Sequence, residues 1–165
     1  MTSSSAPASI EIRPASVTDA PLLAELNDFV HAVHALNRPD VFRSEPSRDD
    51  LVPIFEAHLA RDDIRAFLAW AAGRPVGYAL AIIVDRQGDA LLRPRRFAVL
   101  EHLAVAPNAI RTGVGTALLD AVSAAGRAAG CSRLLTEVWE FNHEAAAFYE
   151  AAGFVSMRHA LERAL

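Results

Sequence analysis

The sequence predicts an α+β fold with three layers, in which a mixed, mostly antiparallel central sheet of about six to seven strands is flanked by about four helices. The order of strand and helix patterns along the 165 residues is β, α, α, β, β, β, α, β, α, β. Gly73 and Arg74 join two consecutive strand patterns in a tight hairpin, which starts the sheet antiparallel. The later alternation of strands and helices adds crossover connections, so the sheet is predicted to be mixed.

The first part of the chain predicts one strand and two helices. Residues 10–15 alternate between apolar and polar side chains, which is typical of a strand. A hydroxyl or carboxylate within residues 16–19 can cap the helix that follows. The apolar face of that helix is formed by Leu22, Leu23, Leu26, Phe29, Val30 and Val33. Residues 37–40 break this helix, and Ser47 is the expected cap of a second helix.

The remainder of the chain alternates strand and helix patterns. The strand patterns lie at residues 65–71, 75–84, 97–105, 132–141 and from Phe154 onward. A polar loop at residues 85–96 separates the second of these strands from the third. One helix begins near Gly113 and ends at Gly130, and Asn142 caps the last helix, which runs to about residue 152.

Composition is that of an ordinary soluble domain. Hydrophobic residues make up 52% of the chain, but no apolar run approaches the roughly 18 residues needed to cross a membrane. Residues 1–9 lack the features of a secretory signal and predict a disordered tail before a single domain over residues 10–165. One cysteine fits a reducing compartment, so a cytoplasmic protein is expected. The net charge of −4 argues against nonspecific nucleic-acid binding and is compatible with a cationic small-molecule acceptor, and no membrane partner is expected.

A pair of glycines at the start of a helix predicts an anion site. Gly113 and Gly115 lie where apolar residues begin to recur at helical spacing, after the buried strand at residues 97–105. A helix start carries about four unpaired N–H groups and the positive end of the helix dipole, which suit a phosphate. Glycine lets the backbone approach the ligand closely. Arg111 and Thr116 can add a guanidinium and a hydroxyl to the same anion.

Two common nucleotide motifs fit this turn badly. A P-loop ends in Gly-Lys-Ser/Thr, and this chain contains no lysine. The dinucleotide fingerprint needs glycines directly after the strand and a small residue at position 118. Here seven residues separate Val105 from Gly113, and position 118 is Leu. A glycine turn before a helix is weak evidence alone, so a second motif is needed.

Two separated motifs, together with the order of elements, resemble the GNAT superfamily of acyl-CoA-dependent N-acyltransferases. The first spans residues 103–119 and contains the run RTGVGTALL after an L-x-V strand end; the second spans residues 142–154 and reads NHEAAAFYEAAGF. Residues 20–64 are the least typical part. The resemblance implies a GNAT-like fold that uses acetyl-CoA as co-substrate, with an amine as acceptor and no metal.

The resemblance also implies where CoA binds. In the family, the pyrophosphate lies on the glycine turn and the pantetheine arm pairs like an added strand with the strand before it. The pyrophosphate residues are then Arg111, Thr112, Gly113, Val114, Gly115 and Thr116, and the pantetheine residues are Leu103, Ala104 and Val105. Asn142 is expected to contact CoA as well as to cap its helix. The family usually has Gln or Arg three residues before the first glycine; this chain has Ile110, so weaker CoA binding is expected.

Tyr149 matches the general acid of the family, which protonates the departing thiolate of CoA. A phenol with a pKa of about 10 can donate a hydrogen bond to a thiolate whose conjugate acid has a pKa of about 8.5. The alternative is an aromatic core residue beside Phe148.

Glu101 is the preferred general base, and His102 is the reserve. An alkylammonium has a pKa of about 10.4 against about 4.3 for Glu, so a bridging water, shifted pKa values or a neutral amine would be required. The alternative for Glu101 is a pairing with a neighbouring arginine. In a regular strand His102 points to the opposite face from Glu101, and a β-bulge would reverse the choice.

His31 and His34 are the candidates for the acceptor pocket, because the variable first two helices of the family shape that pocket. The alternatives are a solvated helix face or a metal site, but no clear third ligand accompanies the pair and no metal is expected. Cys131 has no adjacent base, which disfavours a covalent acyl-cysteine route.

The sequence therefore predicts direct transfer of an acetyl group from acetyl-CoA to a primary amine of a small molecule or peptide, without a covalent enzyme intermediate. Two alternatives remain open: a CoA or acyl-CoA sensor without turnover, and an acetyltransferase that acts on protein N-termini or lysines. A homodimer is the usual expectation for oligomeric state.

Overall fold

The computed structural model describes residues 9–165, which hold five strands and four α-helices. The strands are β1 (Ile10–Pro14), β2 (Ile64–Ala71), β3 (Arg74–Arg86), β4 (Arg95–Val105) and β5 (Leu134–Thr136). The helices are α1 (Ala20–Asn37), α2 (Arg48–Leu59), α3 (Val114–Ala128) and α4 (His143–Ala151), with 3-10 turns η1 (Val17–Asp19) and η2 (Pro107–Ala109). The predicted N-terminal tail lies, except for residue 9, outside the described residues.

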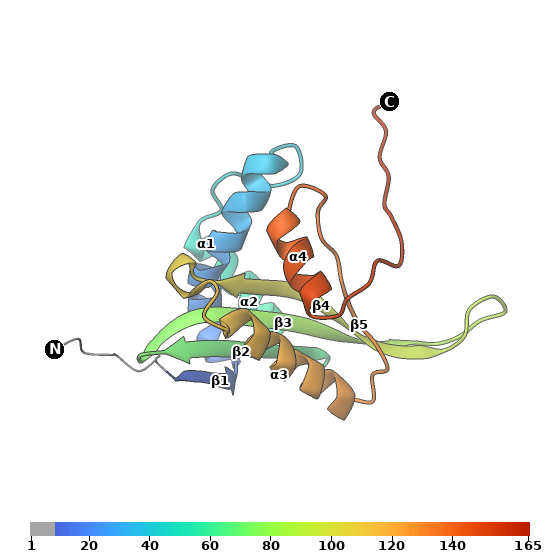
Figure 1. The fold of residues 1–165 in the computed structure, drawn as a ribbon, viewed down its shortest axis with the longest axis horizontal. Helices are drawn as coiled ribbons and strands as arrows, with labels where there is room; N and C mark the ends of the chain where they lie inside the picture. The colour runs from blue at the N-terminus through green and yellow to red at the C-terminus, as the bar shows by residue number, and fades with distance from the viewer. Residues whose placement is uncertain (1–8) are drawn as a thin grey trace.

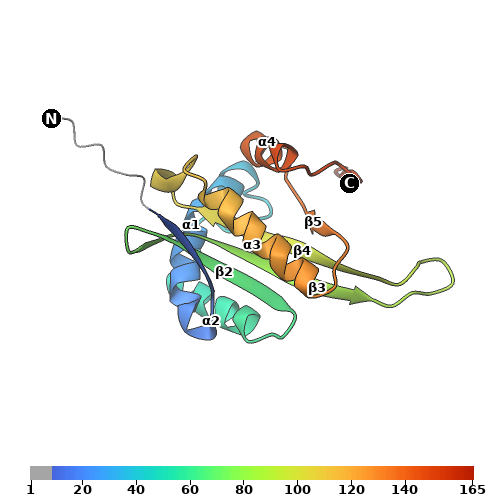
Figure 2. The same cartoon turned by 60° about the horizontal axis from the view of Figure 1, so that its bottom comes forward.

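The sheet is mixed and mostly antiparallel, as predicted. Its strand order is β1-β2-β3-β4-β5, with antiparallel pairing throughout except between β4 and β5, which are parallel. Helices α1 and α2 cover one face, and α3 crosses the other (Figures 1 and 2). The hairpin of β3 and β4 extends beyond the rest of the sheet on the right of Figure 1. The three layers of the predicted fold are therefore present.

Each face of the sheet has its own hydrophobic core. On the side of α1 and α2, Leu23 and Phe55 pack against Leu68, Tyr78 and Leu80 of the sheet. On the side of α3, the buried residues are Ala69, Val76, Ala79, Ala81, Leu100, Ala109, Val114, Leu118, Leu119 and Val122. Alternation along β3 sends successive side chains to opposite cores, so this strand ties the two layers together.

The expected sixth and seventh strands are not formed in the described residues. The predicted final strand from Phe154 is not formed: β5 is the last strand of the sheet, and residues 152–165 hold no strand or helix. The predicted strand at residues 132–141 shortens to β5, since Trp139 and Phe141 leave the sheet and pack on side chains near the end of α1. Tertiary contacts thus override strand propensity in this part of the chain.

Several predicted boundaries are confirmed. The side chain of Ser47 accepts a hydrogen bond from the Asp50 amide at 3.1 Å and caps α2, and α3 begins directly after Gly113. The loop predicted at residues 85–96 is shorter than expected, because β3 and β4 both extend into it. Within residues 9–165, no helix combines the length and the apolar character that a membrane span requires.

Gly77 in β3 is expected to be intolerant of a side chain. A Cβ atom there would lie 2.7 Å from the backbone oxygen of Ala104 and 3.2 Å from side-chain atoms of Val114 and Leu118. Gly77→Ala should lower the free energy of unfolding by about 1–3 kcal/mol, because the Ala104 carbonyl belongs to a paired strand and cannot move aside. Urea unfolding measures this change.

Gly126→Ala in α3 is the matched control. Its Cβ would lie 3.5 Å from Cβ of Ala98, an ordinary contact, and alanine has the higher helix propensity. This variant should be as stable as the parent or up to about 1 kcal/mol more stable. An equal loss of stability in both variants would contradict the packing described for Gly77.

Candidate functional site

A β-bulge at Glu101 changes the direction of β4. Leu80 of β3 is paired with His102 and Ala81 with Leu100, so Glu101 is an extra residue on β4. Before the bulge, Leu100 belongs to the core on the side of α3. After it, His102 bonds to Tyr78 in the opposite core. The bulge therefore turns His102 toward α1 and α2, and the choice between Glu101 and His102 as the base stays a prediction.

The end of β4 presents a free strand edge. β5 pairs only with residues 98–100 of β4, and the chain then leaves the sheet toward α4 (Figure 1). The amide of Ala106 donates to the carbonyl of Val76 in the β3 direction at 2.8 Å. Because backbone groups alternate along a strand, those of Leu103 and Val105 face away from β3, toward the side that β5 has left. Ala104 lies between them, paired with Tyr78.

The glycine turn ends in free helix amides. Gly113 has a φ of 92° and is the N-cap of α3, a conformation that suits glycine, and Arg111 also has a positive φ of 61°. The first backbone bond of the helix runs from the Ala117 amide to the Gly113 carbonyl at 3.0 Å. The amides of the helix residues before it, Val114, Gly115 and Thr116, have no acceptor within the helix.

The surroundings of the turn leave it open on one side and support it on the other. Arg111, Thr112, Gly113 and Thr116 are exposed, whereas Val114 is buried. The Thr112 hydroxyl donates to the carbonyl of Ala109 at 2.6 Å, which ties the turn to η2. The predicted opening of the helix at Gly113 is thus confirmed, and its role in anion binding stays a prediction.

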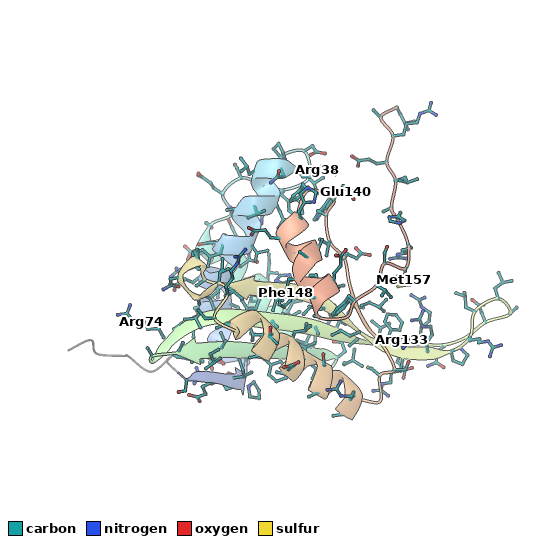
Figure 3. All side chains as sticks on the ribbon, in the orientation of Figure 1. Arg38, Arg74, Arg133, Glu140, Phe148 and Met157 are labelled. Carbon is teal, nitrogen blue, oxygen red and sulfur yellow. The ribbon has the colours of Figure 1, made fainter. Side chains whose placement is uncertain are left out.

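Helix α4 packs across the start of α3 and carries Tyr149. A Cβ atom at Gly115 would lie 3.4 Å from the ring of Phe148, and Figure 3 shows Phe148 at the side of α4 that faces α3. The neighbouring ring of Tyr149 lies 5.3 Å from that of Phe148 and 5.2 Å from that of Phe154. Burial raises the pKa of Tyr149, and a hydrogen bond with Thr136 opposes this, so the phenol keeps its proton.

His102 lies in a chain of buried hydrogen bonds. Its Nδ1 lies 2.8 Å from the Tyr78 hydroxyl, which in turn donates to Oδ1 of Asn27 at 3.0 Å. Burial is the main cause that lowers the pKa of His102 to about 4, followed by the charges of His58 and His34. The ring is therefore neutral near pH 7.

Glu101 is solvent-exposed on the bulge. The pKa of Arg61 is raised first by its hydrogen bond with Asp63 and, among lesser causes, by the negative charge of Glu101. Among residues 9–165, however, no arginine or histidine nitrogen lies within 4.0 Å of the Glu101 carboxylate. The carboxylate is free of the direct pairing that was the alternative to a role in catalysis.

His31 and His34 make local backbone contacts and join an aromatic cluster. Nε2 of His31 lies 2.6 Å from the Arg43 carbonyl, and Nδ1 of His34 lies 2.9 Å from the Val30 carbonyl. The aromatic cluster consists of His31, His34, Phe42, Trp139 and Phe141. Figure 3 shows Arg38 at the end of α1 in this region, where its guanidinium lies 4.9 Å from the Trp139 ring. The cluster connects the loop after β5 to α1.

Asn142 caps α4 as predicted. Its side chain accepts a hydrogen bond from the Ala145 amide at 3.2 Å. The described part of the chain contains no group of three or more His, Cys, Asp or Glu residues arranged to hold a metal ion.

Sequence reasoning did not identify Asn27, Tyr78, Phe42 or the two aromatic residues after β5. A signal existed for Asn27, which lies four residues after Leu23 at apolar spacing along α1 and is nevertheless polar. Tyr78 lies within an apolar strand pattern, where a hydroxyl requires a partner. For the aromatic cluster no local signal existed, because its members come from distant segments.

The architecture defines a class of protein: an α+β domain whose central sheet is open beside β4, with a glycine turn leading into a helix at that opening. The family model described as "Acetyltransferase (GNAT) family" matches residues 30–154. The chain therefore belongs to the GNAT acetyltransferase family. No protein of curated function matches it.

Solved structures share this fold at low sequence identity. A tetramutant of the BH1408 protein of Bacillus halodurans has a TM-score of 0.87 at 23% identity, over 94% of this chain and 99% of the other. Aminoglycoside N-acetyltransferase AAC(6')-Iy in complex with CoA has a TM-score of 0.73 at 21% identity, over 97% of each chain. The aminoglycoside acetyltransferase meta-AAC0020 of an uncultured soil metagenomic sample, in complex with sisomicin, has a TM-score of 0.69 at 17% identity, over 94% and 95%.

Acidification should destabilise the protein through His102. Its pKa in the folded chain is about 4 against 6.5 for a free side chain, so the unfolded chain binds more protons in that interval. The stability contributed by the neutral ring is complete above about pH 6.5 and is lost as the pH falls toward 4, by about 3 kcal/mol in all. Urea unfolding between about pH 7 and about pH 4 measures this loss.

His102→Gln is the control, because glutamine does not titrate. The variant should lose less stability than the parent over the same interval, by the amount that His102 contributes. Parallel pH dependences for the two proteins would contradict the assignment of a buried, neutral His102.

Proposed function

We propose that this protein transfers an acetyl group from acetyl-CoA directly to a primary amine of a small molecule or peptide. The observation that carries the proposal is the arrangement of two sets of unpaired backbone groups. The amides at the start of α3 suit a pyrophosphate, and the edge of β4 at Leu103 and Val105 suits the amides of a pantetheine arm. The GNAT fold and the CoA complex of AAC(6')-Iy support this use of the two features.

The proposed binding mode directs the thioester toward the bulge. A pantetheine paired along residues 103–105 runs from the glycine turn toward Glu101, and Tyr149 of α4 borders the same opening. Asn142 holds the first turn of α4 through its cap and so contributes indirectly to the position of Tyr149. The proposal requires the thioester sulfur to lie within hydrogen-bond distance of the Tyr149 hydroxyl when substrate is bound.

The proposed chemistry is a direct transfer. The amine nitrogen attacks the thioester carbonyl carbon, the carbon–sulfur bond breaks, and an amide and CoA thiol are formed. Tyr149 donates its hydroxyl proton, or a hydrogen bond, to the departing sulfur, and it recovers its proton from solvent. Glu101 accepts the proton of the amine through a bridging water. His102, which the bulge turns toward α1 and α2, is the alternative base for the same proton.

A cationic acceptor fits the region around His31. A hollow in the surface is lined by Asp28, His31, Ala32, Ser44, Glu45 and Pro46. Its two carboxylates, Asp28 and Glu45, would attract an ammonium group. Two of the solved structures with this fold are aminoglycoside acetyltransferases, one of them in complex with sisomicin. His31, which lines this hollow, and His34, three residues further along α1, are proposed as residues of the acceptor site. A homodimer stays a prediction.

A CoA sensor without turnover is the second candidate. The observation that favours it is Ile110, whose side chain is 53% exposed beside the turn where the family usually carries Gln or Arg. Tight binding of CoA without transfer to any amine in a panel of aminoglycosides, polyamines, lysine peptides and free peptide N-termini would support the sensor. Transfer to the peptides alone would instead indicate a protein acetyltransferase.

Tyr149→Phe and Glu101→Gln should each lower kcat/KM for acetyl transfer by about 100-fold or more, because each removes a proton-transfer group and keeps the shape of the side chain. Release of CoA thiol with the best amine of the panel gives the rates. Glu150→Gln, an exposed neighbour of Tyr149 on α4, is the control and should retain the parental rate. Parental rates in both test variants would remove the catalytic assignment.

Arg111→Ala should raise the KM for acetyl-CoA several-fold and leave the KM for the amine unchanged, because the guanidinium is proposed to contact the pyrophosphate. Arg127→Ala is the matched control: it removes an exposed arginine from the other end of α3 and should change neither constant. Equal effects of the two substitutions would indicate a general charge effect and not a site at the glycine turn.

A further inference from the structure

Three polar residues from three different elements form one hydrogen-bonded chain within the core beneath α1 and α2. Asn27 of α1 and Tyr78 of β3 are buried, and His102 of β4 is partly buried. The distances are 3.0 Å from the Tyr78 hydroxyl to Oδ1 of Asn27 and 2.8 Å from the same hydroxyl to Nδ1 of His102.

The direction of these bonds follows from counting hydrogens. A phenol has one hydrogen, and burial raises the pKa of Tyr78 well above its ordinary range, so the hydroxyl keeps that hydrogen. The hydrogen is donated to Asn27 Oδ1, which is a carbonyl oxygen and can only accept. The Tyr78 oxygen can then only accept from His102, so Nδ1 of His102 must carry the ring proton.

The other ring nitrogen is consequently a bare acceptor. A neutral imidazole has one N–H, so Nε2 of His102 has a lone pair and no hydrogen. Nε2 has no hydrogen-bond partner within residues 9–165, and it is not one of the two fully buried nitrogen atoms without a partner, His58 Nδ1 and Trp70 Nε1. It therefore reaches solvent, on the side of the sheet that α1 and α2 cover.

We infer that Asn27 and Tyr78 are positioning residues that hold His102 in the Nδ1–H tautomer, so that Nε2 accepts a hydrogen bond from the acceptor amine or from its bridging water. The catalytic consequence rests on the proposed function; the tautomer itself does not. An amine whose N–H points at Nε2 directs its lone pair elsewhere, as attack on a thioester requires. Phe55 packs edge-on against His102 at 5.7 Å between ring centroids and restricts rotation of the imidazole. Besides burial, the titratable groups whose charges lower the pKa of His102 are His58 and His34.

The tautomer can be measured directly by two-bond ¹H–¹⁵N correlation spectra of protein labelled with ¹⁵N-histidine at pH 7, because a protonated and a bare ring nitrogen differ widely in ¹⁵N shift. His102→Gln identifies the signals of His102. The parent should show a protonated Nδ1 and a bare Nε2. A bare Nδ1 with a protonated Nε2 in the parent would overturn the inference without any other variant.

Asn27→Ala should invert the tautomer. The Tyr78 hydroxyl loses its acceptor and donates to His102 Nδ1 instead, which moves the ring proton to Nε2. Tyr78→Phe should remove the preference and give a mixture. A parental His102 spectrum in folded Asn27→Ala protein, judged by its remaining histidine signals, would overturn the inference. If Asn27→Ala does not fold, Tyr78→Phe decides by the same criterion.

Activity separates this inference from the proposed function. Asn27→Ala should lower kcat/KM for the amine by about tenfold or more, while the KM for acetyl-CoA stays at its parental value. Tyr149→Phe is the matched control for Tyr78→Phe, because it also removes one tyrosine hydroxyl. It should abolish most activity with an unchanged His102 tautomer. A protonated Nδ1 in a protein that transfers acetyl groups to no amine would refute the proposed function and leave the tautomer assignment intact.

Discussion

The β-bulge at Glu101 is the constraint on which the candidate site depends. One extra residue in β4 keeps Leu100 in the core beneath α3 and sends His102 into the core beneath α1 and α2. The same insertion leaves Glu101 exposed at the point where β5 stops pairing with β4. In a regular strand Leu100 and His102 would point to the same face of the sheet, because side chains alternate strictly along it. The bulge is what places them in opposite cores.

The second requirement is close contact between α3 and the sheet. Gly77 lets the Ala104 carbonyl, Val114 and Leu118 approach β3 more closely than a side chain would permit. Val114 is the first residue of α3, so this contact fixes the start of the helix beside the end of β4. Phe148 covers Gly115 from the other side. Packing therefore holds the free amides at the start of α3 beside the free edge of β4.

Much of the fold could be predicted from local patterns, and the errors have a common cause. The helix starts after Ser47, Gly113 and Asn142 depend on capping side chains or on backbone conformation within a few residues, and all three were correct. The strand expected from Phe154 was wrong, and the strand expected at residues 132–141 was too long, because Trp139 and Phe141 pack on Phe42 and His34 instead of extending the sheet. Apolar alternation records the tendency to pair, but it does not record whether a neighbour is available.

The sequence by itself determined the glycine turn and the order of the elements as far as α4, because these rest on residues close together in the chain. The resemblance to the family and the strand pattern singled out Tyr149, Glu101 and His102 as candidates. Only the tertiary structure decided which way His102 points and which of its nitrogens is protonated. That choice depends on Tyr78, 24 positions before it, and on Asn27, 51 positions before Tyr78. Hydrogen-bond direction is a property of neighbours in space, so no reading of one segment could have assigned it.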